Sequence, residues 1–575
     1  MKGIDEMAKT YKEIYNELIG EKFRAAIISY SPHKGTYEYL GYSHQVEVNA
    51  LDDIANLIID DMVFYAFSEN EILKLNDDVD LLADLRAAAK YAYIERLPKR
   101  KKAKSDGTMG EVLLDIFIQL ASQNTQKLIA LILSALISAG IIAPVPIPPD
   151  GIKANANFVF ESEEAGSAEG TAIVKANFDA TYELYWGDAQ GNKLTTSSPS
   201  GKVIPYSWFA QVDVKKGTGE KETNSFLAIP DGAETILLYY QDQLLDTDKI
   251  PEENIPDYGD MTYSFGTLSD VHFGRYFDDE GNDWSDTSYP QALNFLDDMG
   301  VSIVGVSGDL SYEGETSSYE SFHKYNDQHD FNVFSCKGNH DCRDKFDYEG
   351  WKANVNVGVF SDNKPAGVLD VADNGYDFVY SGKETNGDVF IFFSQVKDAY
   401  VPFVQLVTDE QQDWLEAMFE KYKDKRVYLY FHTFLNAPKG NPFLGEGNIY
   451  NDWGLFYTIP YFKGNKDERR FRKLLEKYHN VVFFNGHSHW TYAMECYNPD
   501  LNISDYNGTT ATMVHVSSSG APRTTSFTHP TKESHPGTMS EGIYVKAYKD
   551  FIITNGCDFV NGQFLAYAIY KIDNR

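Results

Sequence analysis

Cysteine and basic residues are both scarce in this sequence. Only four cysteines occur in 575 residues, which is too few for a scaffold built on disulfides. Lys and Arg total 51 against 85 Asp and Glu, giving a formal net charge of −34. That balance argues against a nucleic-acid-binding surface spread over the whole molecule. The apolar fraction of 43% is ordinary for globular protein, and the length predicts several domains.

Long apolar runs are rare as well. Met1–Thr10 has no apolar core, so no signal peptide is expected there. The one long run, Leu128–Ala143, has sixteen residues without a charge and is followed by the proline-rich residues 144–149. Two interpretations stay open: a membrane anchor or export signal that places the rest of the chain outside the cytoplasm, or a buried helix of a soluble protein. The compartment therefore stays open.

Four stretches of the chain differ in character. Residues 1–125 are predicted to be mostly helical, because apolar residues recur at helical spacing, as in Ala50–Leu73. Residues 126–150 hold the apolar run and a linker. Residues 153–255 alternate apolar and polar side chains between turn signals, which is typical of an immunoglobulin-like or fibronectin-like β-sandwich. From residue 262 to 575 strands alternate with helices, which predicts an α/β domain.

Chemically active side chains follow five predicted strands of this last stretch. The strands are Tyr263–Leu268, Val301–Val306, Phe331–Ser335, Val427–Phe431 and Val481–Phe484. The side chains that follow them are, in the same order, Asp270 and His272; Asp309; Asn339 and His340; His432; and His487 and His489. Ligands collect at the carboxyl ends of strands in α/β sheets, and carboxylate, imidazole and amide groups suit divalent metals. The sequence therefore predicts a metal site at these strand ends.

The spacing within the motifs suggests how they hold an ion. Residues i and i+2 of an extended chain point the same way, so Asp270 and His272 are expected to bind one ion together. His487 and His489 either do likewise or reach two neighbouring ions. A glycine precedes Asp309, Asn339 and His487 and is expected to let the backbone turn sharply there.

In this order the motifs resemble those of the calcineurin-like metallophosphoesterases over residues 262–575. The resemblance implies a four-layer αββα sandwich, two β-sheets flanked by helices, that holds two divalent or mixed-valence ions of Mn, Fe or Zn. It places Asp270, His272 and His489 on one metal, Asn339, His432 and His487 on the other, and Asp309 between them. It also places His340 beside the leaving oxygen as proton donor or electrostatic stabiliser.

The activity implied is hydrolysis of phosphate monoesters or diesters, with a phosphorylated small molecule or a phosphodiester as substrate. A metal-bridging hydroxide is expected to attack phosphorus. No Gly-x-Ser-x-Gly motif supplies a covalent nucleophile instead.

Tyr312 departs from the pattern, because many relatives carry an aspartate three residues after the bridging Asp309. The string GDLSY is similar to that of purple acid phosphatases, in which the tyrosine ligates iron. Those enzymes have glycine where this chain has His272, which already fills that coordination position. Tyr312 is therefore a ligand, a hydrogen-bonding neighbour of the ligands or ordinary packing, and the second interpretation fits best. Asp341 is expected beside the ligands in the same way.

Three further expectations concern the surroundings of the site. Cys336 and Cys342 bracket the Gly338–Asp341 loop and form either a disulfide or two thiols, of which two thiols fit better. Trp490, directly after His489, is expected at the rim of the cleft. Residues 502–536, rich in small polar residues, are expected to form a loop.

The N-terminal stretch offers a second line of interpretation. Residues 35–69 and 107–117 resemble the front of the small nuclease subunit of the Hachiman anti-phage system. The later carboxylate–lysine nuclease motif of that family has no counterpart here, since the sequence turns apolar at Leu128, so this part is not expected to cut DNA. Two alternatives stay open: a defence protein whose N-terminal module binds a partner, and a nuclease built on the phosphoesterase domain, which the acidic composition disfavours. The oligomeric state stays open.

Overall fold

A computed structural model divides the chain into two units, residues 1–151 and 152–575. It describes residues 27–31, 36–39, 42–45, 151–215, 217–277, 281–343, 345–396, 407–436, 445–446, 466–493, 502–505, 508–520, 522 and 539–575. The predicted N-terminal helices and the apolar run Leu128–Ala143 lie outside these residues. In the first unit the described residues are three antiparallel strands: β1 (Ile27–Ser31), β2 (Thr36–Tyr39) and β3 (Tyr42–Gln45). No helix within the described ranges is long and apolar enough to cross a membrane.

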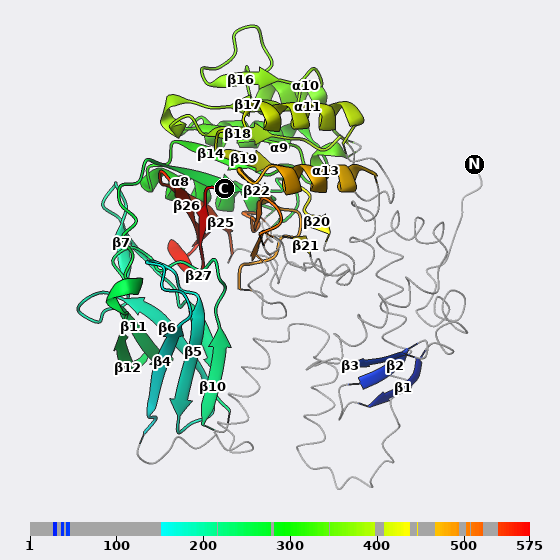
Figure 1. Ribbon diagram of the computed structural model, residues 1–575. Coiled ribbons are helices and arrows are strands. Elements are labelled where there is room, and N and C mark those ends of the chain that lie inside the picture. Colours follow the sequence, from blue (N-terminus) through cyan, green and yellow to red (C-terminus); the bar gives the residue numbers. More distant parts are fainter. Residues whose placement is uncertain are drawn as a thin grey trace. The chain divides into compact units, whose positions relative to one another are not determined.

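Short antiparallel strands fill residues 154–249, as predicted. One sheet has the order β10-β5-β4 and a second the order β12-β11-β6-β9 (Figure 1). The bounds are β4 (Ala154–Phe160), β5 (Gly170–Ala176), β6 (Thr181–Gly187), β9 (Ala210–Asp213), β10 (Thr218–Glu222), β11 (Thr235–Tyr240) and β12 (Gln243–Lys249), with a hairpin of β7 (Thr195–Ser197) and β8 (Val203–Pro205). Alternate side chains are buried along β6, and Trp186 stacks on Phe209 with ring centroids 3.9 Å apart. The immunoglobulin-like class stays a prediction.

Two mixed β-sheets form the centre of the α/β domain, which confirms the predicted fold class for this part. The six-stranded sheet has the order β15-β14-β13-β25-β26-β27, and the seven-stranded sheet β16-β17-β18-β19-β22-β24-β23. The bounds of the first are β13 (Tyr263–Leu268), β14 (Ile303–Val306), β15 (Asn332–Ser335), β25 (Glu541–Ala547), β26 (Phe551–Asp558) and β27 (Gln563–Asp573). Those of the second are β16 (Val368–Val371), β17 (Phe378–Tyr380), β18 (Val389–Phe392), β19 (Val427–Tyr430), β22 (Val481–Asn485), β23 (Ile503–Ser504) and β24 (Thr512–His515). A small hairpin pairs β20 (Leu435–Asn436) with β21 (Gly445–Glu446).

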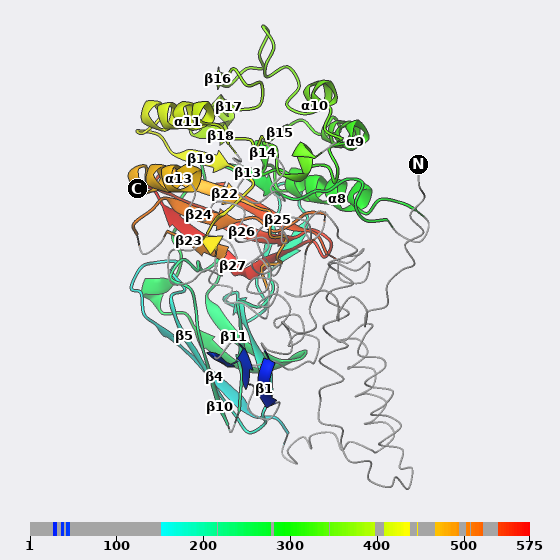
Figure 2. The ribbon, with the colours of Figure 1, turned by 90° about the vertical axis from the view of Figure 1, so that its right-hand side faces the viewer.

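Aromatic side chains fill the space between the two sheets. Phe265 of β13 packs against Phe390 of β18 and Tyr428 of β19, with ring centroids 5.1 and 4.7 Å apart. Helices α11 (Asp409–Lys421) and α13 (Lys466–Lys477) lie on the outer side of the seven-stranded sheet. Helices α8 (Ser285–Asp298), α9 (Thr316–Asn326) and α10 (Tyr348–Asn354) lie on the opposite side of the domain (Figure 2). Helices thus flank the pair of sheets on both outer sides.

All five strands predicted to precede the motifs are present, with bounds shifted by at most two residues. Strands β13, β14 and β15 run parallel, and so do β18, β19, β22 and β24. Their carboxyl ends therefore deliver side chains from both sheets to one region. The prediction that residues 502–536 form a loop is wrong for the short strand β23 and for β24, a buried strand parallel to β22. Its β-branched run was obscured by the surrounding Ser, Thr and Gly.

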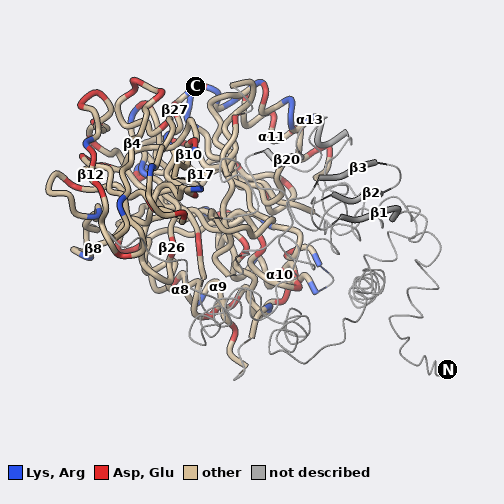
Figure 3. Tube along the Cα trace, turned by 90° about the horizontal axis from the view of Figure 1, so that it is seen from below, with Lys and Arg blue, Asp and Glu red and all other residues tan. Residues whose placement is uncertain are grey.

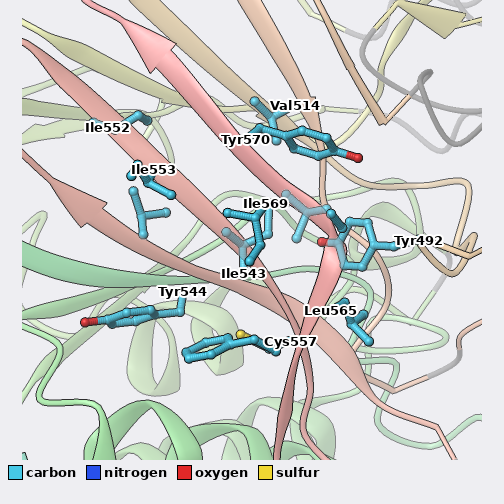
Figure 4. Close-up of a cluster of buried hydrophobic side chains, with 14 of the residues drawn as sticks. Tyr492, Val514, Ile543, Tyr544, Ile552, Ile553, Cys557, Leu565, Ile569 and Tyr570 are labelled. Carbon is cyan, nitrogen blue, oxygen red and sulfur yellow. The ribbon is translucent and has the colours of Figure 1, made fainter. Parts of the chain in front are cut away.

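Strands β25–β27 close the six-stranded sheet and carry much of its core. Their apolar side chains, together with Tyr492 and Val514, gather in one cluster (Figure 4). The outer strand β27 is covered by the small β domain: Ser207 N donates to Phe564 O (2.9 Å) and Ala228 N to Ile569 O (2.8 Å). This contact removes the open sheet edge that β27 would otherwise present.

Arg426 ties the two sheets and the C-terminus together. From the start of β19 its guanidinium donates to Asp388 Oδ2 (3.2 Å), Asn574 Oδ1 (2.6 Å) and the carbonyl oxygen of Tyr548 (2.7 Å). We expect Arg426→Met to destabilise the fold by about 3 kcal/mol, because a largely buried charge pair loses one member. Urea unfolding followed by tryptophan fluorescence measures this, with the exposed neighbour Lys425→Met as control. Equal midpoints for the two variants would contradict the assignment.

Candidate metal centre

The seven side chains predicted to bind metal come together at the carboxyl ends of the parallel strands. Asp270, His272, Asp309 and His489 offer ligand atoms that all lie within 4.8 Å of one another, and Asp309, His432 and His487 do the same. Asp309 belongs to both sets. Asn339 joins the second through its Oδ1, which is 3.1 Å from His432 Nε2. The two sets of candidate ligand atoms, each compact enough to surround one metal ion, thus share the Asp309 carboxylate.

The first set is wholly buried and made of groups whose lone pairs converge. His272 Nε2 and His489 Nε2 are 2.9 Å apart, and His489 Nε2 is 3.0 Å from Asp270 Oδ1. Asp270 Oδ1 and Asp309 Oδ2 are buried and make no hydrogen bond of normal geometry. Buried carboxylate oxygens without such a bond are costly unless a cation takes them up. The donor set therefore fits a divalent metal ion.

The second set is organised around His432. Its Nδ1 donates to the carbonyl oxygen of Ser307 (2.8 Å), which leaves Nε2 facing the site. His432 Nε2 lies 3.1 Å from Asp309 Oδ2 and 3.2 Å from His487 Nδ1. A main-chain carbonyl thus fixes which imidazole nitrogen is offered, as is usual for histidines that bind metal.

The electrostatics agree with a cation site. Burial tends to raise the pKa of Asp270, but His489 and His432 hold it well below its usual range. Burial, helped by Arg275, lowers the pKa of His272 well below its usual range. For His432 burial acts downward, yet Asp309 and Asp270 outweigh it and raise the pKa to about 9. An ionised carboxylate and a neutral imidazole are ready to coordinate, whereas His432 releases a proton on doing so.

The backbone of the site is left-handed where the sequence suggested extended chain. Positive φ angles occur at Asp270 (51°), His272 (54°), Asp309 (56°), His487 (75°) and His489 (62°). Among the described residues, eight non-glycine residues have a positive φ, and these are five of them. The prediction that Asp270 and His272 share an ion because an extended strand points them the same way is therefore wrong in its reasoning, although both reach the site. His487 and His489 fall in different sets, the second of the two options left open. Such rare conformations concentrate at functional sites.

The glycines before the ligands are required by close packing between loops. A Cβ at Gly338 would lie 2.1 Å from Asp309 Oδ1, and one at Gly486 would lie 1.8 Å from Ser269 Oγ. At Gly308, φ is +95° and a Cβ would lie 2.7 Å from the nitrogen of Gly338. The turn predicted from these glycines is therefore present at Gly308, and all three let the ligand-bearing loops touch.

We expect Gly338→Ala to reduce catalytic turnover about 100-fold, because the methyl group must push the Asp309 carboxylate aside and a shift of about 1 Å in an active site has effects of that size. Gly191→Ala is the control for a strained Gly→Ala change away from the site: nothing lies within 4 Å of its added methyl group, but its φ of +76° disfavours alanine. Steady-state kinetics on both variants measures the effect. Turnover within threefold of wild type for Gly338→Ala would mean that Asp309 has no fixed position in the reaction.

His340, at the start of a short 3-10 turn (His340–Cys342), is held against the site by the main chain. Its Nδ1 donates to the carbonyl oxygen of Tyr312 (2.8 Å), and its Nε2 lies 4.0 Å from Asp309 Oδ2. Burial, with help from Arg343, lowers the pKa of His340 well below its usual range. The neutral form therefore presents the Nε2 lone pair to the site.

Tyr312 and Asp341 both contact the loops that carry the ligands. The Tyr312 ring stacks on His340, with centroids 5.2 Å apart and 28° between the planes. Its carbonyl oxygen, which accepts from His340 Nδ1 (2.8 Å), orients the imidazole. Asp341 accepts hydrogen bonds from the nitrogens of Leu310 (3.2 Å), Ser311 (3.0 Å) and Gly338 (3.0 Å), which joins the Asp309 loop to the Asn339 loop.

Several contributors escaped prediction because they are remote in sequence from the motifs. After β24, Ser518 Oγ donates to the carbonyl oxygen of Asp270 (2.7 Å), and Gly520 N donates to the same oxygen (3.2 Å). The His515 Nε2 donates to the carbonyl oxygen of Trp490 (2.9 Å) and so supports the His487–His489 loop. The Ser-Ser-Ser-Gly string after an apolar strand was the one available signal.

Two expectations about the surroundings can be compared with the structure. Trp490 is fully buried, so its predicted place at the cleft rim is wrong. Cys336 and Cys342 are thiols and not a disulfide, as favoured from the sequence.

Comparison with known proteins supports two assignments. Residues 263–491 match the family model of the calcineurin-like phosphoesterases, and residues 17–124 match the HamA model, so both resemblances seen in the sequence are confirmed. A search of curated proteins gives no match.

Similar solved structures include a purple acid phosphatase, PPD1, from yellow lupin seeds, with 15% identity, 73% of this chain and 74% of that chain covered, and a TM-score of 0.33. The Plasmodium protein GAP50 has 12% identity over 54% of this chain and 89% of that one, with a TM-score of 0.34. PhoD has 10% identity over 70% of this chain and 85% of that one, with a TM-score of 0.29. At these identities and TM-scores the similarities carry no argument about function.

Proposed function

We propose that residues 262–575 form a hydrolase of phosphate esters that depends on two metal ions. The observation that carries this proposal is the convergence of the ligand atoms in two sets that share Asp309. The match to the calcineurin-like phosphoesterase model supports it. We assign Asp270, His272 and His489 to one ion, Asn339, His432 and His487 to the other, and Asp309 to both.

Two divalent or mixed-valence ions held there would neutralise phosphate charge and make a water acidic enough to attack phosphorus near neutral pH. The chain supplies the rest. Asp309 is held by the nitrogen of His340, which donates to its Oδ1 (2.8 Å), so its Oδ2 stays turned toward the ligands. Ser518 and Gly520 fix the loop of Asp270 from behind.

His340 is assigned to the leaving oxygen. Its Nε2 points toward the shared carboxylate and its Nδ1 is bonded to a carbonyl oxygen, so a proton gained on the ring is delivered from Nε2. Burial, with a smaller effect of Arg343, lowers the pKa of His340, and the negative charge of a bound phosphate dianion acts in the opposite direction.

Nucleic acid is a poor substrate on this proposal. In the view of Figure 3, Lys and Arg positions are interspersed with Asp and Glu positions over the described residues. With a net charge of −34, phosphodiester polymers are repelled at long range. A small phosphorylated molecule suits such a surface better.

The full-length protein tests the proposal with two chromogenic esters, p-nitrophenyl phosphate and bis(p-nitrophenyl) phosphate. Mn²⁺, Fe²⁺ or Zn²⁺ is supplied, removed with a chelator and supplied again. We expect turnover that disappears on chelation and returns on reconstitution. Turnover that survives chelation, or none with any of the metals, would contradict the proposal.

The domain division also stays a proposal: residues 1–125 as a HamA-like module, 126–150 as linker or anchor, 153–255 as an immunoglobulin-like domain and 262–575 as the phosphoesterase. The HamA match supports a second candidate function, in which the N-terminal module binds a partner in anti-phage defence. Phage plating on cells that express the full chain or its Asp309→Asn variant tests it. Protection by both would place the defence function in the N-terminal module, and protection by neither would exclude it.

A further inference from the structure

Arg275 lies at the edge of the candidate metal centre, and the proposed function gives this positively charged side chain no role. It lies three residues after His272, and its backbone nitrogen donates to the carbonyl oxygen of His272 (3.2 Å). Its Nη1 is 3.2 Å from His272 Nε2. The guanidinium carbon lies 5.0 Å from the ring centroid of Tyr276 and 5.2 Å from that of Tyr312. Two aromatic rings thus hold the side chain beside the ligands.

No carboxylate pairs with Arg275 among the described residues, although the protein carries a large excess of acid. Arg343 is the instructive contrast. It lies three residues after His340 and packs on Tyr312 as well, at 5.1 Å, but it also bonds Glu313 Oε1 (3.3 Å) and the carbonyl oxygen of Tyr312 (3.0 Å). Arg343 is therefore paired with a carboxylate, whereas Arg275 forms no ion pair with the described residues.

Among the described residues, the Arg275 guanidinium has one hydrogen-bond acceptor, His272 Nε2. The same nitrogen is a candidate metal ligand. His272 Nε2 converges with His489 Nε2, Asp270 Oδ1 and Asp309 Oδ2 in the first set. A single lone pair serves either an arginine N–H or a metal, and not both. In the metal-loaded site Arg275 therefore needs another acceptor, and beside metal cations electrostatics favour an anion as that acceptor.

We propose that Arg275 binds a non-bridging oxygen of the substrate phosphate and thereby makes the site selective for phosphomonoester dianions. This rests on the proposed two-metal function. A monoester has three non-bridging oxygens and two negative charges, whereas a diester has two such oxygens and one charge. Arginine presents planar N–H donors that match phosphate oxygens, and charge-assisted bonds of this kind are the strong ones. The third oxygen and the second charge of a monoester are what Arg275 recognises.

The test compares Arg275→Met and Arg275→Lys with wild type in the full-length, metal-loaded protein. Arg470→Met is the matched control, because Arg470 pairs with Asp413 (2.5 Å) and Glu416 (3.2 Å) on α11 and touches none of the candidate ligands. Isothermal titration calorimetry with inorganic phosphate gives a readout that does not depend on turnover. We expect phosphate to bind at least about 10-fold more weakly to Arg275→Met, with partial recovery in Arg275→Lys and no change in Arg470→Met.

Kinetics then separate the substrate classes. For Arg275→Met we expect kcat/KM for p-nitrophenyl phosphate to fall about 10- to 100-fold, while that for bis(p-nitrophenyl) phosphate stays within about threefold. Metal content, measured by inductively coupled plasma mass spectrometry, should stay at the wild-type value. Equal losses for both esters, unchanged phosphate affinity or loss of metal would each overturn the proposal; loss of metal would mean that Arg275 only orients His272. If wild type itself neither binds metal nor hydrolyses either ester, the proposed function fails first.

Discussion

Replacing Asp309 with asparagine is expected to reduce phosphoesterase turnover by about 10⁴-fold or more and to leave at most one metal ion per chain. Asp309 belongs to both ligand sets, and its Oδ2 lies 3.1 Å from His432 Nε2 and 3.6 Å from His272 Nε2. Asparagine can keep the bond from the nitrogen of His340 to Oδ1, so the loop should hold its shape. What is lost is the shared negative charge, and removal of a residue on which a catalytic unit depends has effects of this size.

Asp377→Asn is the control for burying an amide in place of a carboxylate. Asp377 is also fully buried and accepts hydrogen bonds from the nitrogen of Ser394 (2.7 Å) and from Gln411 Nε2 (2.8 Å). Asp377, Ser394 and Gln411 are not candidate metal ligands. The Asp377→Asn variant should keep both metals and its turnover. Metal analysis and steady-state kinetics on both variants decide the matter. If Asp309→Asn still bound two ions, the two sites would not share this carboxylate.

The second large effect is expected at His340. Its replacement by alanine should lower turnover about 100- to 1,000-fold without loss of metal, because general acid catalysis contributes on that scale and none of the metal ligands is removed. An alkyl phosphate, with a poor leaving group, separates the two roles assigned to this residue. If His340 donates a proton, the loss is greater for the alkyl ester than for p-nitrophenyl phosphate. If it only stabilises charge, the two losses are more nearly equal.

Tyr312→Phe is the matched control for His340→Ala. It keeps both the stacked ring and the carbonyl oxygen that receives the His340 Nδ1 proton. We expect turnover within about threefold of wild type, since a phenol that is not a ligand has little part in the reaction. A loss of metal in this variant would make Tyr312 a ligand, as in purple acid phosphatases. A His340→Ala variant with full activity would remove this histidine from the reaction.

The strand ends could be predicted from the sequence, because a central strand that is buried on both faces is an apolar run, and this run stops where the polar loop begins. Tyr263–Leu268 followed by Asp270 and His272 is the clearest case, and its bounds are those observed. The backbone of that loop was not readable. Part of what holds Asp270 comes from segments more than 200 residues away, since the nitrogens of both His487 and Gly520 donate hydrogen bonds to it.

Side chains whose role depends on tertiary contact were missed for the same reason. Arg275 has no distinguishing pattern in the sequence, and its contact with the Tyr312 ring became visible only in the structure. Trp490 was placed wrongly because it directly follows His489, which suggested that it is exposed, whereas its side chain is fully buried. The role of the Tyr312 carbonyl oxygen in orienting His340 could not be predicted either, because every residue has a carbonyl.

The number of metal ions bound by the full-length protein tests the central claim most directly. Protein stripped with a chelator, reloaded with Mn²⁺ or Zn²⁺ and freed of excess ion by gel filtration is analysed by plasma mass spectrometry, with turnover of p-nitrophenyl phosphate measured on the same samples. Two ions per chain, with turnover rising as they are restored, is the result expected from two ligand sets that share Asp309. A protein that binds no ion in the site, or that hydrolyses the ester equally well without one, would contradict the account.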